Sequence, residues 1–145
     1  MNVKPYRRRI NYYETDQMQV VHHSNYARYL EESRLDLMDQ MGLSYARLEH
    51  LGIIIPVLEL HDYYTMALHF GETVMIYPHI YKLSPVRFWL RYEIRGLDGT
   101  LLHKAETVHG FVDKSFRPMN LKKQFPEVFR LFEEAVESGM PSMPE

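Results

Sequence analysis

The sequence contains no cysteine among its 145 residues. Disulfide bonds, thiolate nucleophiles, zinc–thiolate sites and iron–sulfur clusters are therefore excluded. It also has no apolar run of about 18 residues, the length of a membrane span, and no apolar N-terminal stretch typical of a secretory signal. Seventeen basic and nineteen acidic residues leave a formal net charge of −2, which draws the chain to neither nucleic acid nor anionic membrane. We expect a cytoplasmic protein with no nucleic-acid partner.

The composition is 46% hydrophobic and 25% charged, which is typical of a soluble globular protein. A chain of this length can bury a sizeable core, and we expect one domain over residues 1–145. The local exception to the even charge balance is the run Arg7–Arg9. With no second basic cluster to support a nucleic-acid role, we interpret these arginines as charges on an exposed strand edge, where they block unwanted pairing.

Hydrophobic periodicity predicts one long helix early in the chain. Tyr26, Tyr29, Leu30, Leu37 and Met41 recur at spacings that place them on one stripe of a helix over residues 26–41. The charged residues of this segment mostly fall elsewhere. The helix therefore has one face suited to covering a sheet.

Most of the remaining chain is typical of strands joined by short turns. In residues 86–95, Phe88, Leu90, Tyr92 and Ile94 face one way and the charged residues face the other. Residues 97–100 carry the Asp-Gly signal of a hairpin, and Pro78 requires a strand edge or a bulge. Strands joined by tight turns pair antiparallel, so we expect an α+β fold in which four or five strands follow the long helix as a meander. The predicted elements are strands at 3–13, 53–60, 62–68, 73–83, 86–95 and 101–113, helices at 26–41, 44–51 and 126–138, and a tail at 140–145.

The candidate chemistry is concentrated between Tyr12 and Tyr26. Asp16 follows a strand and precedes the long helix, which Ser24 or Asn25 can cap, so its carboxylate can lie beside the helix N-terminus. The unpaired N–H groups there can stabilise an oxyanion formed from a carbonyl substrate. A carboxylate can attack such a carbonyl or activate water. The alternative is that Asp16 only caps local N–H groups of its loop.

Two adjacent histidines, His22 and His23, follow Asp16 in the same stretch. Adjacent side chains on an extended segment point to opposite sides, so we expect these two not to act as one pair. The other six histidines have no spacing typical of metal ligands, and we expect no metal site. The sequence has no G-x-S-x-G elbow and no glycine-rich phosphate loop, which leaves an α/β-hydrolase serine mechanism and a P-loop without support.

The segment from Tyr12 to Arg34 reads Tyr-x-Glu-Thr-Asp-x-Met-x-Val-Val-x-His-x-x-Tyr-x-x-x-x-Glu-x-x-Arg. This pattern resembles the N-terminal signature of hot-dog-fold acyl-CoA thioesterases, and within them the 4-hydroxybenzoyl-CoA thioesterase-like group that includes the Tol-Pal-associated thioesterases. The Pro-x-x-Leu segment at 118–121 is also similar to that group. One departure is Gln19, where many members carry Gly, a residue that permits backbone angles that Gln resists.

The resemblance implies a hot-dog fold, in which an antiparallel sheet wraps around one long central helix. It implies hydrolysis of an acyl-CoA thioester to CoA and a free carboxylic acid, in a homodimer or homotetramer with active sites between subunits. Asp16 would be the nucleophile or general base, and His23 a positioning or polarising residue. Backbone N–H groups of Ser24, Asn25 and Tyr26 would hold the oxyanion. Coenzyme A belongs to the substrate, and no other cofactor is implied.

The resemblance also draws attention to the turn at 82–87, since family members often carry basic and hydroxyl residues there. Lys82, Ser84 and Arg87 would bind the phosphates of coenzyme A. The alternative interpretation is a solvated turn.

Two other functions stay open at this point. A hot-dog hydratase or dehydratase is one, although the spacing from Asp16 to His23 fits its usual pairing of a His with an acid poorly. A non-catalytic acyl-CoA-binding module is the other, and it has no need of a carboxylate near a thioester. The acyl group is not specified, because the candidate wall residues suit aromatic and aliphatic groups alike; they are Tyr45, Tyr63, Tyr64 and Met66.

Overall fold

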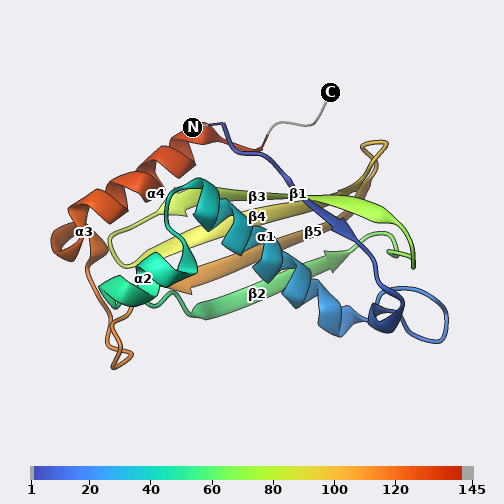
Figure 1. Cartoon of the computed structure of the whole chain (residues 1–145), viewed down its shortest axis with the longest axis horizontal. Helices are drawn as coiled ribbons and strands as arrows, with labels where there is room; N and C mark the ends of the chain where they lie inside the picture. Colours follow the sequence, from blue (N-terminus) through green and yellow to red (C-terminus); the bar gives the residue numbers. More distant parts are fainter. Residues whose placement is uncertain (1, 142–145) are drawn as a thin grey trace.

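The computed structural model describes residues 2–141 and centres on one antiparallel sheet of five strands (Figure 1). The strands lie in the order β1-β3-β4-β5-β2, so β1 and β2 form the two edges. Helix α1 (Tyr26–Gln40) crosses one face of the sheet diagonally, and α4 (Pro126–Ser138) packs on β3. The strands are β1 (Tyr6–Arg9), β2 (Val57–Tyr64), β3 (Thr73–Leu83), β4 (Arg87–Gly96) and β5 (Leu101–Gly110), and the remaining helical elements are α2 (Tyr45–Leu51), α3 (Leu121–Gln124) and the 3₁₀ turns Tyr12–Glu14 and His23–Asn25.

The core lies between α1 and the side of the sheet that faces it. Every residue of the predicted helical stripe is buried, with at most 4% of its surface exposed. The predicted inward face of β4 is buried as well, while Arg87 and Arg91 on the other face are exposed. Both elements therefore turn their apolar side toward a common interior. The predicted α+β architecture, with an antiparallel sheet around one long helix, is confirmed.

Two local predictions about β3 and β4 are confirmed. Strand β1 pairs with β3 only from Thr73 to Ile76, so Pro78 lies on the part of β3 that has a strand on one side alone. Proline has no N–H to donate, and this position requires none. The hairpin between β4 and β5 closes through the Gly96 amide, which donates to the Thr100 carbonyl at 2.9 Å, and Gly99 takes the left-handed conformation at φ 88°.

Two predictions about strands are wrong. The predicted strand at 3–13 ends at Arg9, because the 3₁₀ turn that follows is closed by a 3.0 Å hydrogen bond from the Glu14 amide to the Asn11 carbonyl. The segments at 53–60 and 62–68 contribute to one strand, β2, which pairs with β5 and lies outside the meander of β3, β4 and β5. The choice of β5 depends on contacts between residues far apart in the chain, such as His61 opposite Glu106, which local periodicity does not encode. Residues 142–145 of the predicted tail lie outside the described residues.

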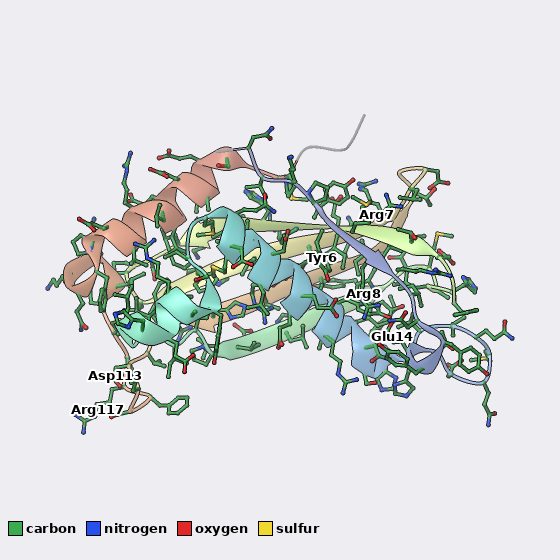
Figure 2. All side chains as sticks on the ribbon, in the orientation of Figure 1. Tyr6, Arg7, Arg8, Glu14, Asp113 and Arg117 are labelled. Atoms are coloured by element: carbon green, nitrogen blue, oxygen red, sulfur yellow. The ribbon has the colours of Figure 1, made fainter. Side chains whose placement is uncertain are left out.

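The arginine run has two exposed members, Arg7 and Arg9, and one that points inward. The edge interpretation is wrong for Arg8, whose guanidinium bonds both carboxylate oxygens of Glu14 at 2.8 and 2.5 Å and reaches Glu32 on α1 at 2.9 Å. Arg8 and Glu14 lie close together where β1 leads into the loop (Figure 2). This ion-pair cluster therefore joins β1, the first 3₁₀ turn and α1.

Glu14 is only 4% exposed and remains charged in the folded protein. Burial by itself raises the pKa of Glu14, but hydrogen bonds from Arg8 and the Asn11 amide outweigh burial and lower that pKa below its ordinary value. A carboxylate with a lowered folded pKa stabilises the fold above its unfolded pKa, and this contribution is lost as pH falls through the folded value.

Replacing Arg8 with Met should lower the free energy of unfolding by about 3 kcal/mol at pH 7, because Glu14 would be left as a buried carboxylate without its cation. The loss should shrink toward pH 4, because the buried Glu14 of the variant, without its cation, takes up a proton there and is no longer an unpaired charge. Urea unfolding at the two pH values measures both effects. Arg7→Met, on the exposed face of the same strand, is the control. Equal unfolding midpoints for the two variants at pH 7 would contradict the assignment.

Candidate functional site

The loop between the two 3₁₀ turns carries Asp16 and is closed by its own backbone. Thr15 forms an antiparallel bridge with Val21, and the Asp16 amide donates to the Val20 carbonyl at 2.9 Å. Val20 also bridges His69, in the segment between β2 and β3. The loop is therefore fixed at both ends, and the position of Asp16 follows from backbone hydrogen bonds rather than from side-chain packing.

Asp16 lines a pocket of about 290 Å³ at the start of α1. One wall comes from the loop and the helix start, and the opposite wall is the stretch that leaves β2. The pocket is lined by Asp16, Val21, His22, His23, Tyr26, Tyr64, Thr65, Met66 and Ala67. Of the residues proposed for catalysis and oxyanion binding, the fold thus brings Asp16, His23 and Tyr26 together, while Ser24 and Asn25 lie outside the pocket wall.

The two oxygens of the Asp16 carboxylate have different surroundings. Oδ1 accepts a hydrogen bond from the Met18 amide at 2.8 Å, which is the loop-capping contact expected of an Asp at this position. Oδ2 has no hydrogen-bond partner among residues 2–141. The capping interpretation and a chemical role are therefore compatible, because capping occupies only one of the two oxygens.

Gln19 takes the left-handed conformation at φ 63°, which glycine adopts readily and glutamine resists. Its amide donates to the Asp16 carbonyl at 3.0 Å, and its carbonyl accepts from the Phe70 amide at 3.2 Å. These bonds hold the residue in the conformation that the family glycine permits. The loop thus contains a non-glycine residue in a strained left-handed conformation.

The expectation that the side chains of His22 and His23 point to opposite sides is wrong. The rings of His22 and His23 lie 4.1 Å apart between centroids with their planes tilted by 32°. The segment is not extended at this point, because His23 already begins a 3₁₀ turn, so adjacent side chains no longer point to opposite sides. His22 Nδ1 accepts from the Ser24 amide at 3.2 Å and lies 2.8 Å from the Ser24 hydroxyl, so His22 caps the turn.

Asn25 occupies the cap position of α1, but its side chain makes no capping bond. Its Nδ2 donates to the Glu14 carbonyl at 2.8 Å, and its Oδ1 accepts from Arg28 at 3.1 Å. The Glu14 carbonyl also accepts from the His22 amide at 2.9 Å. Asn25 thus ties the helix start to the turn that precedes Asp16, a role that spacing alone did not predict.

Sequence reasoning also missed the support behind Tyr26. Its ring lies 4.3 Å from the fully buried ring of His103 on β5, and His103 Nε2 lies 2.7 Å from Asp62 Oδ1 on β2. Tyr64 completes this cluster, 5.1 Å from both rings between centroids. The alternation of β5 was the available signal, since it places His103 on the inward face.

The turn proposed for coenzyme A binding lies at the opposite end of the sheet from the Asp16 loop (Figure 1). Lys82 Nζ lies over the Trp89 ring at 4.5 Å from its centroid. The Ser84 hydroxyl accepts from the Arg87 amide at 3.1 Å, and the Arg87 side chain is exposed. Within one chain, Lys82, Ser84 and Arg87 are therefore not brought to the Asp16 pocket.

Two further features of residues 2–141 bear on other classes of function. No group of three or more His, Asp or Glu side chains in this part of the chain is placed to hold a metal ion. None of its helices has the length and apolar character needed to cross a membrane.

Replacing Gln19 with Gly should leave the loop path unchanged and raise the unfolding midpoint slightly, because relief of the left-handed strain, about 1 kcal/mol, exceeds the added freedom of the unfolded chain. Gln19→Val should lower the midpoint, since a β-branched side chain tolerates this conformation less well. Thermal unfolding of the three proteins is the measurement. If the unfolding midpoint of Gln19→Gly falls as far as that of Gln19→Val, the left-handed conformation of Gln19 is not a source of strain.

The model of the thioesterase-like superfamily matches residues 10–134 of the chain. The Bacillus subtilis (strain 168) protein YneP, which carries the provisional name of an acyl-CoA thioesterase, is 34% identical over 136 residues, or 93% of this chain and 99% of its own length. The 1,4-dihydroxy-2-naphthoyl-CoA hydrolase of Thermosynechococcus vestitus is 25% identical over 108 residues, 74% of each chain. Among solved structures, the DHNA-CoA thioesterase of Staphylococcus aureus superposes with a TM-score of 0.85 at 32% identity, over 90% of this chain and 89% of that one. The chain therefore belongs to the thioesterase-like superfamily and has the hot-dog fold.

Proposed function

We propose that the protein hydrolyses an acyl-CoA thioester, with the free oxygen of Asp16 as the reacting group. One observation carries this proposal: the Asp16 carboxylate is fixed by its loop in a pocket that is also lined by His23, at the start of the 3₁₀ turn that leads into α1. The thioesterase names of the relatives support the reaction class. The Tol-Pal-associated branch, one domain over residues 1–145, a cytoplasmic location and the lack of a cofactor stay predictions.

The reaction consumes one water and yields a carboxylic acid and the free thiol of coenzyme A. Asp16 Oδ2 either removes a proton from the attacking water or itself attacks the thioester carbon. In the second case the thiolate leaves, takes up a proton, and water then cleaves the mixed anhydride. The Met18 amide keeps Oδ1 in place in both cases, so the carboxylate presents the same oxygen to the substrate.

The oxyanion needs a donor at the helix start, and the His23 amide is the best candidate. Ser24, Asn25 and Tyr26, the residues expected from the sequence, already donate their amides to His22 Nδ1, the His22 carbonyl and the His23 carbonyl. The His23 amide is the first of its turn, where helical geometry leaves N–H groups without an acceptor. It also benefits from the positive end of the helix dipole.

The open edge of the sheet supports a homodimer, one of the two assemblies that the resemblance implies. Strand β2 has a partner on one side only, and every residue from Val57 to Tyr64 except Asp62 is exposed. Exposed side chains along it include Leu60 at 43% and Tyr63 at 52%. A long apolar edge is a template for pairing with another strand. We therefore place β2 against the β2 of a second copy, antiparallel across a two-fold axis.

This pairing would complete the site. Residues 64–67, at one end of β2, wall the Asp16 pocket, and Val57 begins the other end about 24 Å away. A two-fold axis through the middle of β2 would set the partner's Val57 beside Tyr64. Arg87 lies opposite Gly110, whose amide donates to Pro56, so Arg87 belongs to the Val57 end of the sheet. The dimer would thus bring the partner's coenzyme A turn toward Asp16.

Asp16→Asn should lower kcat for acyl-CoA hydrolysis by at least about a hundredfold, since the amide is neither a base nor a nucleophile at neutral pH. Its Oδ1 still accepts from Met18, so the loop and the unfolding midpoint should be unchanged. Thiol release over an acyl-CoA panel provides the rate. Full activity of the variant would remove Asp16 from the mechanism. Binding of acyl-CoA by the wild type without any thiol release would favour the non-catalytic module, and addition of water to an enoyl-CoA would favour the hydratase.

A mixed dimer of one Asp16→Asn chain and one Arg87→Glu chain should recover about half of the wild-type activity. One of its two sites would combine an intact Asp16 with an intact Arg87 from the partner, and the other would contain both changes. Two affinity tags isolate the mixed dimer, and kcat/KM for acyl-CoA is measured beside both parent dimers. If Asp16 and Arg87 served the same site from one chain, neither site would be intact, and no activity above the mean of the parents would appear.

A further inference from the structure

A second and larger cavity, of about 840 Å³, lies between α1, α2 and the segment that leads into β2. It shares no residue with the Asp16 pocket, and the proposed chemistry does not use it. Much of its wall is apolar, including Leu48, Ile53 and Ile55. One charged residue in that wall, Arg34 of α1, is 92% buried, with 8% of its surface exposed.

Among residues 2–141, Arg34 has no anionic partner. Its one recorded hydrogen bond runs from Nη1 to the Tyr92 hydroxyl, at 3.1 Å. The Tyr92 hydroxyl is in turn hydrogen-bonded to a neutral group, the Thr107 hydroxyl, at 2.8 Å. The Thr107 hydroxyl is also hydrogen-bonded to His109 Nε2, at 2.9 Å. Burial and the nearby Arg34 charge lower the pKa of His109 to about 3, so His109 is uncharged at neutral pH. The guanidinium is thus a buried cation whose other donors lack a protein acceptor among the described residues.

The other charged residues of the cavity do not neutralise Arg34. Glu31, Glu49 and Lys114 line the same space, but all three are exposed, and none forms an ion pair with it. Charges at the exposed rim are screened by water and counterions, whereas Arg34, with 8% of its surface exposed, is screened less. An unpaired buried charge is unfavourable, and a ligand that supplied an anion would remove that penalty.

We propose that Arg34 binds a carboxylate at the far end of the acyl group, so that the preferred substrates are CoA monothioesters of dicarboxylic acids. A carboxylate supplies the missing charge and matches the forked donors of a guanidinium, which a neutral hydroxyl does not. This inference rests on the proposed function. It concerns the acyl group, whereas Asp16 and His23 concern the thioester.

The proposed dimer gives the acyl group a route to this cavity. Residues 53–56 of the cavity wall immediately precede Val57, and residues 64–67 of the Asp16 pocket wall follow the other end of β2. The two-fold axis that sets the partner's Val57 beside Tyr64 therefore sets the partner's cavity beside the Asp16 pocket. A thioester held at Asp16 would extend its acyl group across the subunit boundary toward Arg34 of the partner subunit.

The test uses Asp16→Asn protein, in which the ligands should survive, and titration calorimetry with two six-carbon ligands. Adipoyl-CoA ends in a carboxylate and hexanoyl-CoA ends in a methyl group. Adipoyl-CoA should bind at least about tenfold more tightly, since hydrogen bonds to charged groups are the stronger class. Adding Arg34→Met should bring the two dissociation constants to about the same value, and Arg34→Lys should give an intermediate ratio. Octanoyl-CoA and suberoyl-CoA repeat the comparison at a greater length.

Three controls separate recognition from stability. Arg130→Met removes an exposed arginine of α4 and should keep the wild-type ratio. Tyr92→Phe removes the protein hydrogen bond of Arg34 but keeps its charge, and should also keep the preference. If Arg34→Met fails to fold, Arg34→Lys and Tyr92→Phe decide: an unchanged ratio in Arg34→Lys overturns the proposal, and a reduced ratio there with a retained one in Tyr92→Phe supports it. Neutral 6-hydroxyhexanoyl-CoA should bind like hexanoyl-CoA.

Equal binding of adipoyl-CoA and hexanoyl-CoA would overturn the proposal, as would equal weakening of both by Arg34→Met or tight binding of the hydroxyl ligand. These outcomes leave the proposed hydrolysis untouched, because the wild type would still release thiol from hexanoyl-CoA. A wild type that releases thiol from neither ligand, although the Asp16→Asn protein prefers adipoyl-CoA, would refute the hydrolysis and support the role of Arg34.

Discussion

The geometry of the candidate site depends on the ion pair between Arg8 and Glu14. The carboxylate of Glu14 is held from β1 by Arg8, and its backbone carbonyl accepts from the His22 amide and from Asn25. One residue therefore connects the edge strand, the turn before Asp16 and the start of α1. Because Glu14 is buried, this arrangement is stable only while the guanidinium is present, and any movement of β1 relative to α1 would move the loop.

Local hydrogen bonds then position the reacting groups inside that frame. The Asp16 loop is closed by backbone bonds and by one oxygen of its own carboxylate, which leaves the second oxygen for chemistry. Gln19 is strained because it adopts a left-handed conformation that glycine would adopt freely. The 3₁₀ turn at His23 places an early amide beside the same pocket. A small number of backbone contacts thus does most of the positioning, and side-chain packing contributes mainly the Tyr26 wall.

The exposed β2 strand and the far coenzyme A turn suggest that one chain supplies half of each site. Asp16 lies at one end of β2, and the large cavity with Arg34 lies at the other. A single two-fold operation on that strand would join the reactive end of one chain to the binding end of the other. In such a dimer the partner subunit would bind both the acyl group and coenzyme A, while the chain that supplies Asp16 would cleave the thioester.

The sequence predicted best what depends on local periodicity. The stripe of α1, the alternation of β4 and the bounds of α4 follow from side-chain spacing of 3.6 or 2 residues, and all three are observed. The partner of β2 depends on long-range pairing, and that prediction failed. The prediction that the His22 and His23 side chains point to opposite sides failed, because His23 begins a 3₁₀ turn and does not continue an extended segment.

Two other features had weak signals in the sequence. The spacing Asn11-x-x-Glu14 is typical of a capping box and predicts the 3₁₀ turn Tyr12–Glu14. Arg34 falls four residues after Leu30 and three before Leu37, on the buried stripe of α1, where a charge is unusual. Both signals gain their meaning from burial, which a single sequence does not report. The ion pair of Arg8 with Glu14 and the unpaired state of Arg34 therefore emerged only from the structure.

The most direct test of the account is a crystal structure of the Asp16→Asn protein with an acyl-CoA analogue in which a methylene group replaces the thioester sulfur. We expect the analogue to lie between two subunits that pair through β2, with its carbonyl oxygen about 3 Å from the His23 amide and its carbonyl carbon facing residue 16. Its pantetheine arm should run toward the partner's Arg87. An analogue bound within one chain, or with its carbonyl remote from residue 16, would contradict the account.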